Sequence, residues 1–257
     1  MFEPDICSDK TELGRRAAEA GADAIRTAIA ARGEATIVLA TGASQFATLA
    51  ALTAVPDIAW DRVTAFHLDE YIGLAPAHPA SFRGYLRQRF LQPLNGRAGL
   101  NEIDGEAADA EAEADRLSAL LAHRTVDVCF AGLGENCHLA FNDPPADFST
   151  DRAFIVVTLD QACRAQQLGE GWFATLDDVP RRAITMSVPQ IMRSALIVLS
   201  VPDARKARAV HNAVEGPITP LHPGSILQRH PATRLYLDPP AASLLSVRSG
   251  PAGLRRS

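Results

Sequence analysis

The stretch that decides the fold spans residues 131–145 and reads AGLGENCHLAFNDPP. It follows Val126 to Ala131, a short β-branched and aromatic run of the kind that forms a buried strand. Two glycines then break the pattern, His138 stands among polar neighbours, and two consecutive prolines prevent any regular continuation. A loop of this composition directly after a buried strand indicates a functional site.

Outward from this stretch, short apolar runs alternate with segments of helical periodicity. We expect strands at Ala35–Ala40, Val63–Leu68, Phe154–Leu159, Ile184–Val188, Leu196–Val201 and Arg234–Leu237. We expect helices at Asp9–Gly33, Phe46–Ala54, Ala80–Leu91, Ala108–Leu121 and Asp203–Gly216, and a polar loop at Gln161–Gly171. Such alternation predicts an α/β fold with a largely parallel sheet, helices on both faces and right-handed crossovers.

Length and composition favour one globular domain over residues 1–257, with a tail at about 241–257 that frays. The hydrophobic fraction of 47% comes without any long apolar span, so we expect no membrane partner. The net charge of -5 lacks the basic footprint on which nucleic-acid binding relies. Four cysteines without C-x-x-C spacing, after an N-terminus unlike a signal peptide, favour the cytoplasm.

Two further stretches at strand ends carry chemistry-bearing residues. Thr41, Gly42, Ala43 and Ser44 form a small-residue loop before a helix, where backbone N–H groups and hydroxyls can hold an anion, although a plain turn is equally compatible. Asp69 and Glu70 follow a predicted strand, and ligands of open α/β sheets bind beyond the carboxyl ends of strands. The alternative for this acidic pair is a solvated turn or a helix cap.

Four motifs in order closely resemble glucosamine-6-phosphate deaminases. They are FHLDEYIGL at 66–74, HPASF at 78–82, the stretch 132–145, and Lys206 followed by AVEG at 213–216. The resemblance runs from about Thr36 to Asp238 and implies a modified Rossmann-like fold. It implies conversion of D-glucosamine 6-phosphate to D-fructose 6-phosphate and ammonia, with no cofactor. Gly132 and Gly134 lack a third glycine at position 137, so they are no dinucleotide fingerprint.

The resemblance implies catalytic roles for four residues. Asp69 matches the base that takes the proton from C2 of the open sugar, and His138 matches the histidine that opens the ring. Asp143 stands where the family usually has a glutamate, and Asn136 where many members have an aspartate, so Asn136 orients His138 without adding charge. Cys137 replaces a usual glycine, and we interpret it as a small buried spacer rather than a catalytic thiol.

The resemblance also implies a substrate-binding set. Thr41, Gly42, Ala43 and Ser44 match the phosphate loop in position, Lys206 matches the phosphate lysine, and Glu70 is expected to contact substrate. The family's phosphate arginine has no clean counterpart. Arg164 or Gln167 can substitute for it, although a neutral glutamine binds phosphate more weakly than a bidentate guanidinium.

Several alternatives stay open. Within the fold, the chain can be a 6-phosphogluconolactonase-type hydrolase, although that pattern has arginine where Tyr71 stands, or a galactosamine-6-phosphate deaminase, which differs by one hydroxyl contact. A non-catalytic sugar-phosphate sensor is a third reading. The spacing of His67, Asp69, Glu70 and His138 fits no standard zinc pattern, so we expect no metal. A homo-oligomer is compatible with the sequence.

Overall fold

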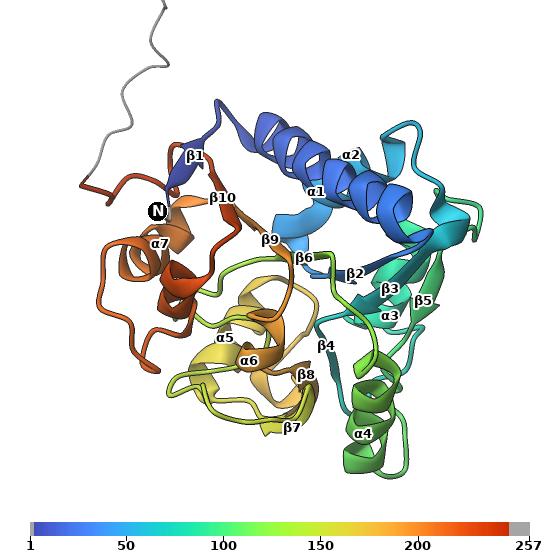
Figure 1. The fold of residues 1–257 in the computed structure, drawn as a ribbon. Helices are drawn as coiled ribbons and strands as arrows, with labels where there is room; N and C mark the ends of the chain where they lie inside the picture. The colour runs from blue at the N-terminus through green and yellow to red at the C-terminus, as the bar shows by residue number, and fades with distance from the viewer. Residues whose placement is uncertain (1–2, 247–257) are drawn as a thin grey trace, which may run out of the picture.

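The structure is a computed structural model that describes residues 3–246. Its main sheet has seven parallel strands in the order β1-β10-β9-β6-β2-β3-β5 (Figure 1). The strands are β1 (Pro4–Ile6), β2 (Ala35–Leu39), β3 (Val63–His67), β5 (Gly99–Asn101), β6 (Val128–Ala131), β9 (Leu196–Val201) and β10 (Thr233–Leu237). The largely parallel sheet is therefore confirmed. The edge strands β1 and β5 were not predicted, because three residues are too few to show a periodic pattern.

The central strands are buried on both faces. In β2, Val38 packs in the core on one face of the sheet, whereas Ile37 and Leu39 pack in the core on the other. A strand covered on both sides is apolar throughout, which explains why this segment shows no alternation in the sequence.

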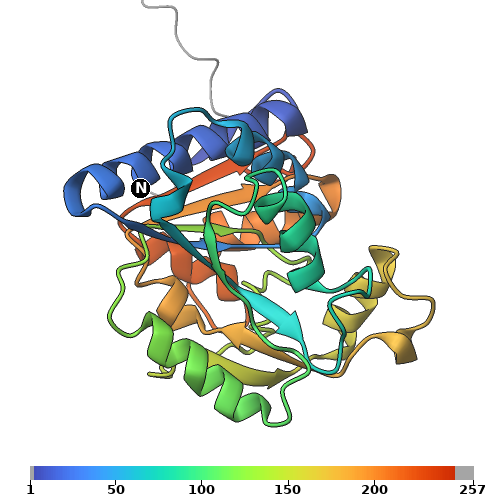
Figure 2. The same cartoon turned by 90° about the vertical axis from the view of Figure 1, so that its right-hand side faces the viewer.

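Helices cover both faces of the main sheet (Figures 1 and 2). On one face lie α1 (Lys10–Arg32) and α2 (Phe46–Ala54); on the other lie α4 (Ala110–Leu121), α6 (Val188–Ile191) and α7 (Ala207–Val214). The side chain of Asp9 accepts two backbone N–H bonds at the start of α1, and Gly33 ends the helix with a φ of 82°. Both ends of this helix are as expected.

A second, antiparallel sheet adjoins the first. It contains β4 (Asp69–Tyr71), β8 (Arg182–Met186) and β7 (Phe154–Thr158), in that order. Leu68 joins the sheets, because its N–H donates to Leu39 of the main sheet at 3.1 Å and its carbonyl accepts from Met186 of the second at 2.6 Å. Figure 2 shows β4 running away from the main sheet. Asp69 therefore lies where the chain changes sheets.

The expected loop at Gln161–Gly171 is wrong over most of its length. It forms α5 (Gln161–Gly169), whose first turn is capped by the side chain of Asp160. The helix buries a narrow stripe, Cys163 and Gln167, which are four residues apart. The segment is so polar that the sequence does not reveal this narrow buried face. The remaining helix, α3 (Phe82–Leu86), continues as a π-helical turn at Arg87–Leu91, within the helical segment expected there.

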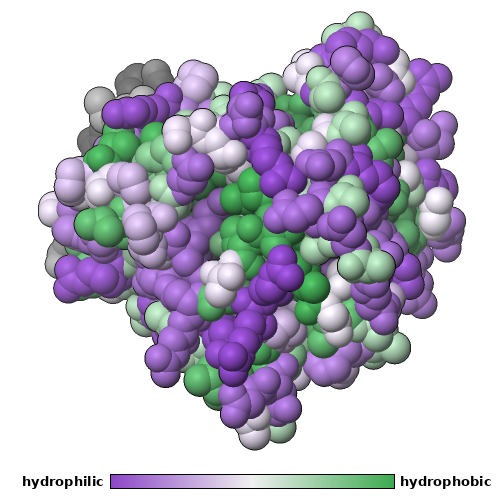
Figure 3. Space-filling view, turned by 90° about the horizontal axis from the view of Figure 1, so that it is seen from below, coloured by the Kyte–Doolittle hydropathy of each residue, from purple (hydrophilic) through white to green (hydrophobic). Residues whose placement is uncertain are grey.

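The C-terminal segment packs further than expected. Ala241 is fully buried, and the backbone N–H of Ala241 donates to Asp238, so fraying does not begin there. The rest of the expected tail, 247–257, lies outside the described residues. Within residues 3–246, every helix is too short or too polar to cross a bilayer. One face of the molecule is mostly hydrophilic, with hydrophobic side chains gathered near its centre (Figure 3).

Candidate active site

A cavity of about 350 Å³ opens where four strands of the main sheet end. Its walls come from the segments that follow β2, β3, β6 and β9, and from α5. Parallel strands bring their carboxyl ends to one edge of the sheet, so residues distant in sequence meet there. The cavity lining includes Thr41, Gly42, Ala43, Ser44, Asp69, His138, Gln167 and Lys206. Eight of the twelve predicted site residues therefore share one space.

Asp69 lines this cavity from the first position of β4. Burial, together with the neighbouring Glu70 carboxylate, raises the pKa of Asp69 to about 8. The backbone of Asp69 is held by His67, whose Nδ1 lies 2.8 Å from the Asp69 carbonyl oxygen. The Nε2 of His67 accepts the N–H of Ile103 at 2.8 Å, so Nδ1 carries the proton and donates it to that carbonyl. Burial lowers the pKa of His67 to about 4, which keeps the ring neutral.

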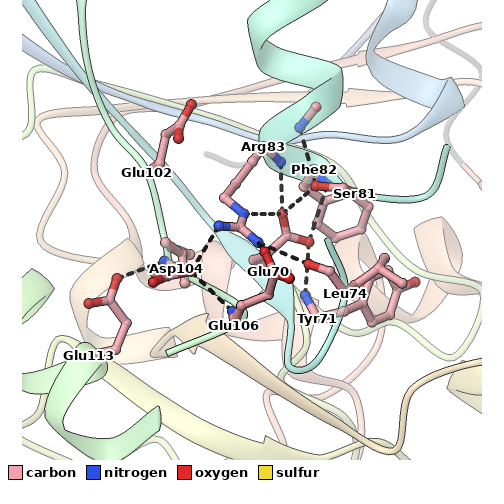
Figure 4. A network of polar contacts seen from close by, with 12 residues as sticks. Glu70, Tyr71, Leu74, Ser81, Phe82, Arg83, Glu102, Asp104, Glu106 and Glu113 are labelled. Atoms are coloured by element: carbon pink, nitrogen blue, oxygen red, sulfur yellow. Dashed lines mark hydrogen bonds and ion pairs between the residues drawn. The ribbon is translucent and has the colours of Figure 1, made fainter. Parts of the chain in front are cut away.

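Glu70 points the other way, so its expected contact with substrate is wrong. Adjacent residues of a strand face opposite sides, and Glu70 is fully buried outside the cavity lining. Its carboxylate accepts the backbone N–H of Arg83 at 2.8 Å and the hydroxyl of Ser81 at 3.0 Å, and it pairs with the Arg83 guanidinium at 3.5 Å (Figure 4). Arg83 in turn pairs with Asp104. Glu70 thus fastens β4 to the start of α3.

His138 projects into the cavity, with Asp143 behind it. The Nδ1 of His138 lies 3.0 Å from Oδ1 of Asp143. Asn136 donates from Nδ2 to the same carboxylate oxygen at 3.1 Å and accepts the backbone N–H of His138 at 3.1 Å. Burial opposes ionisation of Asp143, but the hydrogen bonds from His138 and Asn136 outweigh it and hold the pKa of Asp143 below its usual value.

Asn136 and Asp143 are outside the cavity lining, although we expected both among the catalytic residues. Both contact His138 through hydrogen bonds instead of lining the cavity themselves. The shorter Asp143 still reaches the imidazole, because the loop brings its main chain close enough for a 3.0 Å contact.

The loop around His138 has an unusual backbone. Cys137 and Ala140 have φ of 73° and 52°, a region that side chains with a Cβ seldom occupy. A Cβ on Gly134 would lie 2.3 Å from the His138 ring, so only glycine allows the imidazole its position. Cys137 is buried, and burial raises the pKa of its thiol to about 11. Both observations support its interpretation as a spacer.

The expected phosphate loop and the expected lysine lie together. Gly42 has a φ of 94°, which turns the chain between β2 and the helical residues that follow. Lys206 is buried and lines the same cavity, and burial lowers the pKa of its ammonium, against the effect of the Glu135 and Glu170 carboxylates. A desolvated ammonium in the same cavity as a small-residue loop is suited to an anion.

The two substitutes for the missing arginine behave differently. Arg164 is wrong as a phosphate ligand, because its guanidinium donates to the backbone carbonyls of Leu176 and Val179 and lies outside the cavity lining. Gln167 lines the cavity, and its Oε1 accepts the Tyr71 hydroxyl at 2.8 Å, which leaves its amide NH₂ as a donor.

Sequence reasoning missed charged residues that the fold brings to the same cavity. Lys10, at the start of α1, pairs with Asp203 at 3.5 Å, and Arg205 pairs with Glu135 at 3.5 Å. Glu170 also lines the cavity, close to Gly42. A helix capped by Asp9 is an ordinary N-terminus, so no sequence signal distinguished Lys10 from a solvated lysine.

Comparison with known proteins places this geometry in a family. The model of the family described as glucosamine-6-phosphate isomerases/6-phosphogluconolactonase matches residues 8–236, which include every site residue named above. The chain belongs to this family.

Relatives within the glucosamine-6-phosphate isomerase/6-phosphogluconolactonase family include two named glucosamine-6-phosphate deaminase. The protein from Exiguobacterium sibiricum is 38% identical over 72% of this chain and 71% of its own length. The protein from Lactobacillus delbrueckii subsp. bulgaricus is 33% identical over 93% of this chain and 98% of its own.

Solved structures from the family agree with the fold. A monomeric glucosamine-6-phosphate deaminase superposes with a TM-score of 0.84 at 31% identity, over 95% of this chain and all of that one. A 6-phosphogluconolactonase from Shewanella baltica gives a TM-score of 0.78 at 21% identity, over 93% of this chain and 98% of that one. At that identity, the second likeness concerns the fold alone.

Proposed function

We propose that this chain is a glucosamine-6-phosphate deaminase that converts D-glucosamine 6-phosphate and water to D-fructose 6-phosphate and ammonia. The observation that carries the proposal is that Asp69 and His138 line one cavity, with Asp143 hydrogen-bonded to His138 from behind. The names of the relatives support the same reaction.

Asp69 serves as the base of the isomerisation. It takes the proton from C2 of the open-chain sugar, and the same carboxyl can return a proton at C1. A base needs a pKa near the working pH, and burial brings the pKa of Asp69 to about 8. Hydrogen bonds of His67 and Leu68 hold the backbone of Asp69 where the chain passes from one sheet to the other, so the position of the carboxylate is fixed.

His138 serves as the acid/base that opens the ring. Its Nδ1 is held by Asp143, so the other ring nitrogen is the one offered to the cavity for proton exchange with the ring oxygen. The Asp143 carboxylate stabilises the imidazolium when it forms. Asn136 keeps that carboxylate oriented and adds no charge.

The phosphate of the substrate binds between the loop 41–44 and Lys206. Backbone N–H groups at the start of the helical segment, the hydroxyls of Thr41 and Ser44, and one ammonium provide its partners. Lys10 adds a second positive charge to the same cavity. One solved relative is a monomeric glucosamine-6-phosphate deaminase, so we propose that a single protomer is catalytically complete. We place it in the cytoplasm, because its four cysteines are free and buried.

The test is to incubate the purified protein with glucosamine 6-phosphate and measure ammonia and fructose 6-phosphate. Equal amounts of both products are expected. Galactosamine 6-phosphate is assayed in parallel, and its faster turnover would move the assignment to that epimer.

Hydrolysis of 6-phosphogluconolactone without ammonia from either amino sugar would refute the proposal in favour of a lactonase. Binding of the sugar phosphates without any turnover would refute it in favour of a sensor. Asp69→Asn is the matched control, since it keeps the side-chain shape but removes the base.

A further inference from the structure

Cys163 lies against the hydrogen-bonded pair of His138 and Asp143. It is carried by α5, and its side chain is buried. One ring nitrogen of His138, one carboxylate oxygen of Asp143 and the sulfur of Cys163 all lie within 4.8 Å of one another. The nitrogen and oxygen are already in contact at 3.0 Å. The ring-opening role uses the first two groups and leaves the thiol unexplained.

The three donor atoms are those that zinc prefers. Tetrahedral Zn²⁺ binds imidazole nitrogen, carboxylate oxygen and thiolate sulfur at about 2.0 to 2.3 Å, which places its ligand atoms roughly 3 to 4 Å apart. The measured spacing needs only small side-chain movements to reach that geometry. A sulfur and a nitrogen donor disfavour Mg²⁺ and Ca²⁺, which prefer oxygen.

The electrostatic surroundings of the thiol also favour a cation. The Cys163 sulfur lies within 4.8 Å of an Asp143 carboxylate oxygen, so a carboxylate already stands beside the thiol. Asp160 caps α5 three residues before Cys163, and the Asp160 backbone N–H donates to the second oxygen of Asp143 at 3.3 Å. A divalent cation would neutralise this negative cluster and displace the thiol proton to solvent.

We propose that His138, Asp143 and Cys163 form a site for a thiophilic divalent cation, represented by Zn²⁺, whose binding reversibly inhibits the enzyme. The inhibitory part rests on the proposed deaminase function; the binding part does not. The cation replaces the protons on the Cys163 sulfur and on the ring nitrogen that faces Asp143. His138 then cannot exchange its charge with Asp143, so ring opening stops.

The position of the site determines the pattern of inhibition. Asp143 and Cys163 stand behind His138, outside the cavity lining, while the phosphate loop and Lys206 lie within that lining. The cation therefore leaves the phosphate contacts in place. We expect kcat to fall with little change in KM.

The first test measures binding without activity. The protein is freed of metals with EDTA, dialysed, and titrated with Co²⁺, which gives a near-ultraviolet thiolate-to-metal absorption band when a cysteine is a ligand. One equivalent of Co²⁺ should produce the band, and Zn²⁺ should abolish it by displacement. Cys163→Ser should lack the band, whereas Cys7→Ala, which changes another buried cysteine on β1's connection to α1, should retain it.

The second test measures inhibition of turnover by Zn²⁺ and its reversal by EDTA. Cys163→Ser should keep the basal turnover and need more than about tenfold more Zn²⁺ for the same inhibition. Absence of the Co²⁺ band in the parent protein, or equal Zn²⁺ sensitivity in Cys163→Ser and Cys7→Ala, would overturn the site. A Co²⁺ band in a protein that releases no ammonia would refute the proposed function and leave the binding site standing.

Discussion

At the scale of the residue, the chemistry depends on how burial changes the protonation of individual groups. Asp69 and His67 are two residues apart and both buried, yet burial moves their pKa values in opposite directions, to about 8 and about 4. In each case the neutral form is favoured, because a low-dielectric environment disfavours charge. His67 is thereby a fixed hydrogen-bond partner, and Asp69 a base that ionises within the working range of pH.

The raised pKa of Asp69 predicts the pH dependence of the reaction. A base must be ionised, so kcat/KM should rise as pH increases through about 8, which is the value for the free protein. Steady-state kinetics from pH 6 to 9.5 checks this. A profile already flat at pH 6.5 would contradict it. Asp69→Asn should lower kcat by roughly a hundredfold or more, with the same KM.

Asn136 allows a charge to be added beside the ring-opening histidine. Asn136→Asp places a carboxylate where the amide now contacts Asp143 and the His138 backbone. Negative charge favours the imidazolium, so the limb of the pH–rate profile governed by ring opening should move to higher pH. Asn136→Ala, which removes the donor but adds no charge, is the control and should not move it upward. An identical profile for all three proteins would remove position 136 from the mechanism.

At the scale of the element, helix termini and one strand junction assemble the site. The start of α1 brings Lys10 to the cavity, the first turn of α5 brings Cys163 behind His138, and β4 carries Asp69 on one side and Glu70 on the other. The buried Glu70–Arg83 pair fixes β4 against α3 (Figure 4). The Glu70 carboxylate oxygens also accept the backbone N–H groups of Phe82 and Arg83, so hydrogen bonds from the protein stabilise the buried carboxylate.

Lys10 tests whether α1 contributes to phosphate binding. Lys10→Ala should raise KM for the sugar phosphate by about three- to tenfold with kcat nearly unchanged, because a partly exposed charge contributes modestly. The effect should shrink as salt is added. Arg15→Ala is the control, since Arg15 lies on the same helix, pairs with Glu19 and is outside the cavity lining. Equal KM values for both variants would exclude Lys10 from the site.

At the scale of the whole molecule, the two sheets share a boundary, and the active site lies at that boundary. Leu68 hydrogen-bonds to both sheets, and the next residue is the proposed base. The fold therefore holds an unfavourable buried carboxyl at a point where the backbone is fixed from two sides. We therefore expect the free energy of unfolding to depend on pH through this carboxyl.

His67 and Asp69 have opposite effects on the free energy of unfolding. Between pH 4 and 6.5 the unfolded chain protonates His67 more readily, so its contribution rises with pH; Asp69 is protonated more in the folded chain, so its contribution falls from about pH 4 to 8. The wild type should lose stability from pH 6.5 to 8. Asp69→Asn should abolish that loss and reveal a rise of about 3 kcal/mol from pH 4 to 6.5. Urea unfolding across this range measures both, and a variant that still loses stability above pH 6.5 would contradict the assignment.

Local pattern determined much of this protein. Short, mainly apolar runs predicted five of the parallel strands, because a strand buried on both faces needs few polar residues. Asp9 and Gly33 marked both ends of α1, because caps act through neighbouring backbone groups. Motif resemblance brought Asp69, His138, Lys206 and the loop 41–44 together, and they do share one cavity. Only the tertiary structure decided that β7 and β8 pair apart from the main sheet and that Glu70 lies outside the cavity lining. It also decided that the Arg164 guanidinium bonds to backbone carbonyls, that Lys10 lines the cavity, and that Cys163 lies behind His138. These outcomes depend on contacts between residues far apart in the chain, because the path of the backbone determines which side chains come close enough to interact.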